Sequence, residues 1–501
     1  MTDPETLERT EWRARIRELE RGAAPLDPGP AERGRLLDAA ARYVERFLEE
    51  LPERLAFETD RSASARVRDV QIGHGVHGME ELLNLYDEAV AMPGLNPAAP
   101  GHLGYIPGGG IYASSIGDYV AAATNEYAGV SYASPGGVEM ENQVLAWMAN
   151  LVGYPETARG SLTAGGSVAN FVAVHAAREA TGLRARDVPD AVVYSTSHAH
   201  HCLERALRVA GLAETISRRV PLDERYRMRP EALAAAIAED RANGLRPWMI
   251  MASAGTTDVG AIDPLDAIAD VAEAEDLWFH VDAAYGGFFA LVDSIGPLLS
   301  GMERTDSIVL DPHKTLFLPY GTGAVLVRRG ADLRNAHTYE ANYMQDVVHD
   351  EADSPADLSL ELTKHFRGPR VWFPLLLHGV EPFRRCLEEK IELTRYFHRE
   401  VERRGFEVGP DPALTVAMYR WVPAEGDAND FNRALTEYVH DDGRVFISTT
   451  MIDDVFVLRA AVVVFRTHLE HIDLALQILE QGVAELEAHP ERWRRDLPAP
   501  S

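Results

Sequence analysis

The sequence contains the segments Phe279-His-Val-Asp-Ala-Ala-Tyr-Gly-Gly287 and Ser307-Ile-Val-Leu-Asp-Pro-His-Lys314. Each segment includes a short apolar run, which predicts a buried strand. Alternate side chains of a strand share a face, so His280, Asp282 and Ala284 are predicted to point the same way. Lys314 follows the second run directly, 32 residues after Asp282. The two segments therefore predict a carboxylate and an amine at neighbouring strand ends.

Lysine is scarce in this chain, which makes Lys314 informative. The lysines are Lys314, Lys364 and Lys390, so 49 basic residues minus three lysines leaves 46 arginines. A guanidinium stays protonated and cannot form an imine, whereas a lysine amine can. Pyridoxal phosphate needs such a lysine, and a carboxylate that keeps its pyridine nitrogen protonated. The pair of Asp282 and Lys314 predicts this cofactor, although Asp282 alone could instead cap the next helix.

The composition is that of an ordinary globular chain. It has 501 residues, of which 46% are hydrophobic and 25% charged, enough for two or three domains. No apolar stretch reaches the roughly eighteen residues of a membrane helix, and the N-terminus lacks the apolar core of a secretion signal. Two cysteines cannot form a disulfide framework. We therefore expect a cytoplasmic protein, and its net charge of -29 argues against nucleic acids and anionic membranes as partners.

The order of predicted elements divides the chain into three parts. Residues 1–100 form an N-terminal helical segment, in which residues 33–52 carry an apolar face suited to packing on another domain or a second subunit. Residues 101–375 alternate strands and helices, which predicts a large α/β domain around a mainly parallel sheet. Within it, residues 335–362 are acidic and weakly periodic, so we expect a mobile catalytic loop. Residues 376–501 form a small C-terminal α/β domain.

A glycine pair in the predicted α/β domain could form a phosphate site. Gly165 and Gly166 precede Ser167 and an apolar helix. Free backbone N–H groups and the helix dipole favour an anion at such a helix start. The same residues could also form only a tight turn between a strand and a helix. Gly255-Thr-Thr257 follows another predicted strand, at the sheet edge where ligand sites form.

A histidine cluster could serve the cofactor or a metal ion. His198, His200 and His201 lie directly before Cys202. Adjacent side chains at a helix start diverge, so we expect no metal ion. We expect instead that one histidine stacks on a cofactor ring.

These segments together resemble the group II pyridoxal-phosphate-dependent decarboxylases, which include the aromatic-L-amino-acid and glutamate decarboxylases. The similarity covers roughly residues 100–470 and is carried by motifs in the family's order. They are His102-Leu-Gly-Tyr-Ile-Pro107, Ser134-Pro-Gly-Gly-Val-Glu-Met-Glu141, Gly165-Gly-Ser167, Ala199-His-His-Cys-Leu-Glu-Arg205, Gly255-Thr-Thr257, His280-Val-Asp-Ala-Ala284, Asp311-Pro-His-Lys314, Phe366-Arg-Gly-Pro-Arg-Val-Trp372 and Val457-Leu-Arg459.

The resemblance implies a fold-type I enzyme, a set of site residues and a homodimer with active sites near the interface. Lys314 would bind pyridoxal 5′-phosphate covalently, Asp282 would pair with the pyridine nitrogen and His200 would stack on the ring. The cofactor-binding set is Gly165, Gly166, Ser167, His200, Thr257, Asp282, Ala284, His313 and Lys314, with Thr257 hydrogen bonding toward Asp282. Tyr343 in the predicted loop would protonate the substrate α-carbon, or would only anchor the loop by packing.

Three residues depart from the family's pattern. Thr315 replaces a large apolar residue after the lysine, and Thr322 replaces a small one. Asp311 stands where relatives often carry an asparagine that helps to bind phosphate. A carboxylate beside a phosphate dianion would be repelled unless it turned away or carried a proton.

The resemblance implies α-decarboxylation of an L-amino acid to an amine and carbon dioxide. Other reactions of the same fold type stay open, including those of aminotransferases, C–S lyases and aldol-cleaving enzymes. An aldehyde synthase is another alternative, against which the retained Tyr343 argues. A non-catalytic scaffold that kept the fold is a further alternative, from a different class.

The predicted substrate pocket is apolar. In the family it is lined by the positions of Tyr105, Ile106, Pro107, Ala128, Val130 and Thr363. Burying an aromatic ring on such a surface favours binding by a few kcal/mol. No lysine or arginine in these segments would pair with a side-chain carboxylate, which argues against glutamate. We therefore expect an aromatic L-amino acid, with phenyl and phenolic side chains ahead of an indole, which Thr363 would crowd. Aliphatic and acidic amino acids are the alternatives.

Overall fold

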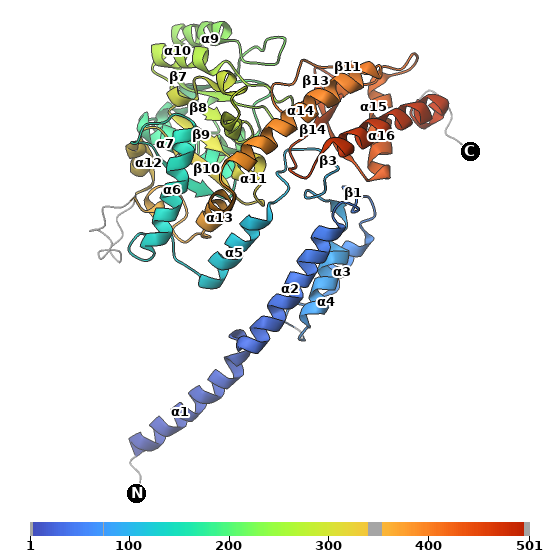
Figure 1. Ribbon diagram of the computed structural model, residues 1–501. Helices are drawn as coiled ribbons and strands as arrows, with labels where there is room; N and C mark the ends of the chain where they lie inside the picture. Colours follow the sequence, from blue (N-terminus) through green and yellow to red (C-terminus); the bar gives the residue numbers. More distant parts are fainter. Residues whose placement is uncertain (1–3, 74, 339–352, 495–501) are drawn as a thin grey trace. The chain divides into compact units, whose positions relative to one another are not determined.

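The computed structural model describes residues 4–73, 75–338 and 353–494 (Figure 1). Its contacts divide the chain into two units. The first comprises Met1–Arg54 and Glu58–Leu95, and the second Leu55–Phe57 and Asn96–Ser501. The large and small α/β parts expected from the sequence both belong to the second unit.

The first unit is helical. Its α-helices are α1 (Pro4–Ala23), α2 (Pro30–Glu50), α3 (Ala65–Asp69) and α4 (Met79–Tyr86). Pro30 begins α2, where the missing N–H costs no hydrogen bond. The α2 helix covers most of the predicted amphipathic segment and packs on α4, with the rings of Tyr43 and Tyr86 6.0 Å apart.

The second unit contains a seven-stranded sheet in the order β4-β10-β9-β8-β7-β5-β6. Its strands are β4 (Arg159–Thr163), β5 (Ala191–Ser195), β6 (Ile216–Arg219), β7 (Arg246–Ser253), β8 (Trp278–Asp282), β9 (Ser307–Leu310) and β10 (Gly323–Val327). Neighbours from β9 to β6 run parallel, and β10 is antiparallel to both β4 and β9. The sheet is therefore mainly parallel, and the strands β4, β9, β8, β7 and β5 all end at the same edge.

Both faces of this sheet are covered by helices (Figure 1). The helices of the domain are α5 (Tyr112–Thr124), α6 (Pro135–Leu151), α7 (Gly166–Ala180), α8 (Cys202–Val209), α9 (Pro230–Ala242), α10 (Leu265–Glu275), α11 (Pro312–Thr315), α12 (Gly330–His337) and α13 (Gly368–His378). Alternation along the strands fills two cores. Ile308 and Leu310 pack with α6, α9 and α10, whereas Val309 packs with α7 and α8. Asp282 also projects toward α7 and α8, because its partners Asn170 and Cys202 lie there.

A second sheet has the order β11-β12-β14-β13-β3. It comprises β3 (His102–Leu103), β11 (Glu407–Val408), β12 (Val416–Arg420), β13 (Phe446–Ile452) and β14 (Val455–Ala461) and packs with α14 (Glu381–Arg403), α15 (Ala428–Asp442) and α16 (Leu469–Ala488). β3 pairs in parallel with β13 although it lies more than 300 residues earlier. The C-terminal sheet thus includes residues that the sequence pattern placed in the large domain. Two further short strands are β1 (Phe57–Glu58) and β2 (Gly94–Leu95).

The segment 335–362, predicted as one loop, is partly regular. Residues 335–337 form the last turn of α12, and Pro355–Asp357 form a 3-10 turn. The expectation of an irregular loop is wrong for these residues, since Leu333 is buried and anchors α12 on the core. Residues 339–352 lie outside the described residues. Within the described chain, no helix combines the length and the apolar content needed to span a bilayer.

Candidate active site

A cavity of ≈ 360 Å³ lies where the strands end and α7 begins. It is lined by all nine residues that the sequence analysis assigned to the cofactor, namely Gly165, Gly166, Ser167, His200, Thr257, Asp282, Ala284, His313 and Lys314. Its other lining residues include Asn170, Cys202, Tyr285 and Asp311. The carboxyl edge of a parallel sheet is where α/β proteins build ligand sites.

Lys314 presents a charged amine to this cavity. Its Nζ lies 3.0 Å from Oδ2 of Asp311. Burial disfavours the charge, but the carboxylates of Asp311 and Asp282 outweigh this effect and raise the pKa of Lys314 above its usual value. The side chain of Lys314 is therefore protonated and carries a positive charge. The short helix α11 carries Lys314 directly after β9, which fixes the amine beside the sheet edge.

Asp282 ends β8 and is held by three donors. Its Oδ1 accepts the N–H of Ala284 at 3.1 Å. Its Oδ2 accepts Nδ2 of Asn170 at 3.3 Å and the thiol of Cys202 at 3.5 Å. Among the described residues, Thr257 contributes no donor to Asp282, so the expected hydrogen bond between them is wrong. Thr257 still lines the cavity, because hydrogen bonds from the second sheet hold the loop that carries it.

A chain of hydrogen bonds behind Asp282 fixes the orientation of Asn170. Burial lowers the pKa of His280 to about 4, so this imidazole is neutral. Its Nδ1 lies 2.8 Å from Oγ of Ser307, which also accepts the indole N–H of Trp278 at 2.9 Å. Its Nε2 can therefore donate to Oδ1 of Asn170, at 2.9 Å. The amide of Asn170 is thereby turned so that its Nδ2 faces Asp282.

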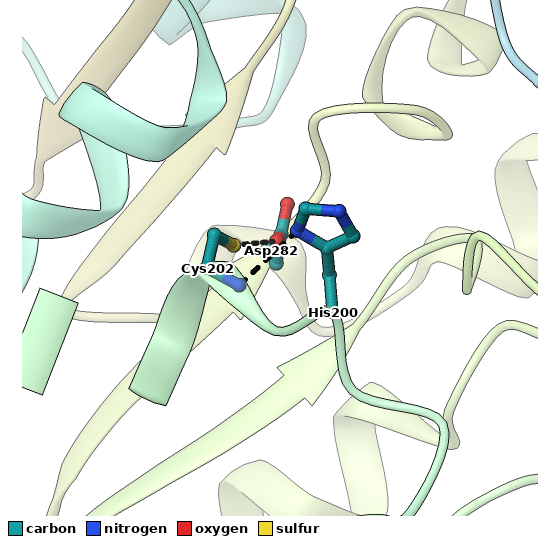
Figure 2. Close-up of side chains that lie close together, drawn as sticks. All are labelled: His200, Cys202 and Asp282. Carbon is teal, nitrogen blue, oxygen red and sulfur yellow. Dashed lines mark hydrogen bonds between the residues drawn. The ribbon is translucent and has the colours of Figure 1, made fainter. Parts of the chain in front are cut away.

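His200 and Cys202 flank Asp282 (Figure 2). The N–H of Cys202 donates to Nδ1 of His200 at 3.3 Å. Potential ligand atoms of the three residues lie within 4.8 Å of one another, a spacing that could hold a metal ion. Burial raises the pKa of the Cys202 thiol, however, and only a thiolate ligates metals well. Burial also lowers the pKa of His200, which leaves a neutral ring facing the cavity.

The glycine pair forms the start of α7. Gly165 has a φ of +147°, a conformation that side chains disfavour. A Cβ on Gly166 would lie 2.8 Å from Oδ2 of Asp311, so this position has no room for a side chain. Ser167 lies in the first turn of α7, where the N–H groups of Gly166 and Ser167 have no acceptor within the helix, whereas that of Val168 donates to the carbonyl oxygen of Gly165 at 3.0 Å. His313 lies beside the turn, with Nδ1 2.5 Å from the carbonyl oxygen of Thr322.

Arg459 of β14 holds the loop that carries Thr257. Its buried guanidinium donates to the carbonyl oxygen of Thr257, to that of Asp258 at 2.6 Å and to Oγ of Ser448 at 2.9 Å. Burial lowers the pKa of Arg459, and these acceptors compensate for the lost hydration. The second sheet thus helps to shape the cavity.

The residues predicted to bind the substrate side chain do not line this cavity. Ile106 and Pro107 are buried, whereas Tyr105 is exposed and has a φ of +51°. Their segment runs along α11, because the N–H of Gly108 donates to the carbonyl oxygen of His313 at 3.3 Å. Thr363 is exposed, beside a buried ion pair of Lys364 and Glu141 with 2.5 Å between Nζ and Oε2. Tyr343 lies outside the described residues.

The sequence patterns assign no role to Asn170, Cys202 or Arg459, and they do not predict the pairing of Asp311 with Lys314. Asn170 follows Gly166 by four residues, so it lies one helical turn behind the glycine pair. A polar residue at that spacing in an apolar helix was the available signal. Arg459 belongs to the motif Val457-Leu-Arg459, but this motif did not indicate its role, because its contacts depend on the packing of the second sheet.

The cavity fits pyridoxal 5′-phosphate. The free N–H groups of α7 suit a phosphate, the fixed carboxylate of Asp282 suits a protonated ring nitrogen, and the amine of Lys314 suits an aldehyde. Its volume lies in the range of roughly 300–1,000 Å³ that is usual for ligand sites. The fold and this site together define a fold-type I pyridoxal-phosphate enzyme.

Comparison with known proteins narrows this class. Residues 78–421 match the pyridoxal-dependent decarboxylase conserved domain. The chain is 31% identical to the aromatic-L-amino-acid decarboxylase of Bacillus atrophaeus, over 80% of this chain and 84% of the relative. It is 33% identical to the cysteine sulfinic acid decarboxylase of Mus musculus, over 60% of this chain and 63% of that protein. This protein therefore belongs to the pyridoxal-dependent decarboxylase family.

The fold is also similar to that of a solved structure. A crystal structure of Oryza sativa TDC with PLP and tryptamine superposes with a TM-score of 0.86. The superposition covers 92% of this chain and 99% of that chain, at 24% sequence identity. This likeness establishes the fold, including the mainly parallel sheet and the second sheet that holds the Thr257 loop.

Proposed function

We propose that this protein decarboxylates an aromatic L-amino acid to its amine, with pyridoxal 5′-phosphate attached to Lys314. One observation carries the proposal: the Lys314 ammonium, the fixed Asp282 carboxylate and the start of α7 line a single cavity. When bound, the cofactor supplies a ring that accepts electrons from the bond broken at the substrate α-carbon.

The side chains of this chain have separate tasks in that reaction. Asp282 holds a proton on the ring nitrogen, and Asn170 and Cys202 keep its carboxylate in place. His200, neutral and half-buried, would lie against the cofactor ring. The small side chain of Ala284 would leave room for the ring, and Thr257 would also contact it. Gly165, Gly166, Ser167 and His313 bind the phosphate.

The proton that completes the product needs a further group. We assign it to Tyr343, 29 residues after Lys314 in the acidic segment. The described residues around that segment are anchored. Asp353 pairs with Arg159 and Arg334, and the hydroxyl of Ser354 accepts the N–H of Ser131 at 3.0 Å. If Tyr343 supplies this proton, Tyr343→Phe should still release carbon dioxide, but in air more of the product should be oxidised by dissolved oxygen to aldehyde and ammonia. The amine-to-aldehyde ratio therefore reports on this assignment.

Two observations support an aromatic substrate. The Bacillus atrophaeus relative is named for aromatic L-amino acids, and it covers four-fifths of this chain. The segment Tyr105–Pro107 contains the apolar residues Ile106 and Pro107 and lies along the helix of Lys314, although it does not line the cavity of the single chain. The Mus musculus relative is named for an acidic amino acid, which makes acidic substrates the second candidate.

A substrate panel tests this proposal. With the purified protein and pyridoxal 5′-phosphate, we expect carbon dioxide release with kcat/KM highest for L-tyrosine or L-phenylalanine. L-tryptophan should follow, and L-valine, L-leucine, L-glutamate and L-cysteine sulfinate should be at least roughly a hundredfold slower. A buried aromatic ring gains about 3 kcal/mol over a poorly fitting side chain, which gives this ratio.

The panel distinguishes an error in the assigned substrate class from an error in the assigned reaction. If an acidic or aliphatic amino acid leads, the aromatic assignment is wrong while the decarboxylase assignment stands. If amino acids are consumed with a keto acid product and no carbon dioxide, the reaction is a transamination and the proposal fails. Reactions without enzyme, with cofactor alone, provide the blank.

We also propose a homodimer, which would cover apolar surface that a single chain exposes. On α5, the side chains of Tyr112, Ile116 and Tyr119 are exposed. On α1, Trp12, Ile16 and Leu19 are 70%, 52% and 55% exposed. Their spacing of four and three residues makes one stripe along the helix, which is the pattern of a two-stranded coiled coil. Arg15 and Glu20 flank that stripe, and in a parallel pair they would face each other across the two chains.

Cysteine substitution tests the pairing of α1 with α1 of a second chain. Ile16→Cys should form a disulfide-linked dimer under mild oxidation, because paired core positions bring two Cα atoms within disulfide reach. Ala14→Cys, two residues away on the outer face of the stripe, is the matched control and should stay monomeric on denaturing gels. The unmodified chain controls for Cys202 and Cys386. Equal cross-linking at both positions, or at neither, would contradict the pairing.

The cytoplasmic location stays a prediction from the sequence. So does the expected absence of nucleic-acid and membrane partners, which rests on the net charge.

A further inference from the structure

Asp311 is a buried carboxylate that contacts the amine of Lys314. It directly follows β9 and precedes Lys314 by three residues, so the short helix α11 places both side chains on one face. Its Oδ2 lies 3.0 Å from Nζ of Lys314, a distance at which an ammonium donates a hydrogen bond to a carboxylate. The side chain of Asp311 is 2% exposed and that of Lys314 is 24% exposed, and both line the cavity. The carboxylate therefore holds the amine at the cavity wall.

Asp311 is the anion that pairs with this amine. The cavity has a second carboxylate, that of Asp282, but three hydrogen-bond donors already hold it. Within the described part of the chain, the contact with Asp311 is the one ion pair that Lys314 forms. The position of the free amine thus depends on Asp311.

The surroundings of the amine favour its charged form only because of the carboxylates. Among the described residues, the other titratable groups near it are His200, Cys202, His313 and Tyr320. Burial lowers the pKa of the two imidazoles and raises the pKa of the thiol and of the phenol, so these groups are uncharged near neutral pH. Burial also disfavours the ammonium, but Asp311, followed by Asp282, raises the pKa of Lys314 above its ordinary value.

In the proposed reaction, Lys314 is a free amine at two stages. Before the cofactor is attached, the amine is free; it then reacts in its neutral form with the aldehyde, forming a carbon–nitrogen bond and releasing one water. The amino acid later takes the place of Nζ at the same carbon. Its ammonium loses one proton to become the attacking amine, and the released Nζ gains one, so the protons balance. Lys314 is then a cation again, as in the cofactor-free protein.

We propose that Asp311 is a positioning residue that binds the Lys314 amine, as an ammonium, whenever this amine is not bonded to the cofactor. The inference rests on the proposed function, because it requires Lys314 to be the attachment site. It gives a role to a carboxylate at a position where an asparagine is the family's usual residue. An amide oxygen could accept a hydrogen bond from the released amine but would not balance its charge.

The first test follows the attachment of pyridoxal to the cofactor-free full-length protein by absorbance. Pyridoxal lacks the phosphate, so any effect of Asp311 on phosphate binding is left out. The measured quantity is the ratio of the attachment rate constants, Asp311→Asn over wild type, in which the ionisation of pyridoxal itself cancels. Loss of an opposite charge lowers the pKa of an amine by about one to three units. Because only the neutral amine reacts, the variant should react roughly ten- to a thousandfold faster at about pH 7.

Asp306→Asn is the matched control for this substitution. Asp306 directly precedes β9, where it accepts the N–H of Phe279 at 2.9 Å, and its variant should react at the wild-type rate. Equal acceleration in Asp306→Asn and Asp311→Asn would assign the effect to a loosened β9 and would overturn the role of Asp311.

A second measurement uses the wild type alone and serves if Asp311→Asn does not fold. The chain has three lysines, so ¹⁵N-labelled lysine gives few Nζ resonances, and that of Lys314 is the one absent from Lys314→Arg. In the cofactor-free wild type, this Nζ should titrate with a midpoint above about 10.4, the ordinary value for a lysine. The same measurement decides the question if pyridoxal attaches to neither protein.

The outcomes distinguish this inference from the proposed function. A rate ratio near one at about pH 7, or a wild-type Nζ midpoint below the ordinary value, overturns the role of Asp311 and leaves the cofactor assignment intact. Failure of pyridoxal 5′-phosphate to attach to Lys314 overturns the proposed function and this inference together.

Discussion

Lys314→Arg should abolish both the covalent attachment of the cofactor and decarboxylation. The guanidinium keeps the charge beside Asp311 but cannot react with an aldehyde. We expect kcat to fall by roughly 10⁴–10⁶-fold, the range found when an enzyme loses its reacting side chain. The yellow absorbance of the attached cofactor should disappear, and carbon dioxide release should fall to the level of free cofactor.

Borohydride reduction of the wild type provides the matching positive result. The reduced cofactor should be found by peptide mapping on Lys314 and not on Lys364 or Lys390. The other two lysines form ion pairs with glutamates. Lys364 pairs with Glu141, and Lys390 donates to Glu389 at 2.9 Å. Label on either of them would refute the assignment, as would a yellow, active Lys314→Arg protein.

The residues that carry the chemistry could be predicted because local patterns place them. Asp282 ends one apolar strand and Lys314 follows the next, and the ends of parallel neighbours meet at one edge of a sheet. Gly165 and Gly166 mark the start of an apolar helix, whose first N–H groups attract anions. The hydrophobic periodicities of strands and helices were therefore enough to predict the α/β fold and the group of residues around the cavity.

The partners of these residues could not be predicted, because they depend on contacts between distant segments. Asn170 meets Asp282 across 112 residues, and Arg459 reaches Thr257 across 202. Neither distance leaves a periodic pattern in the sequence. Tyr105 and Thr363 show a related limit. Both are exposed on a single chain, whereas the sequence pattern predicted that they line a pocket, because local patterns do not encode the contacts between distant segments that would cover them.

Asp282→Ala should retain some cofactor but lose nearly all turnover. Lys314 and the start of α7 still bind the cofactor, whereas no carboxylate then keeps a proton on its ring nitrogen. Removing one partner of a buried charge pair costs about 3–5 kcal/mol, which is roughly two to four orders of magnitude in kcat. The measurement is kcat for the best amino acid of the panel, together with absorbance of the bound cofactor.

Asn170→Ala provides the control for this effect. Asn170 is a positioning residue, since it touches Asp282 through one hydrogen bond of 3.3 Å and leaves the carboxylate in place. Losing that bond should cost about 1–2 kcal/mol, or roughly a five- to thirtyfold decrease in kcat. The two variants share the same cavity and the same cofactor attachment, so their difference isolates the carboxylate charge. If Asp282→Ala keeps activity equal to that of Asn170→Ala, Asp282 only shapes the cavity, and the proton on the ring nitrogen is held by another group.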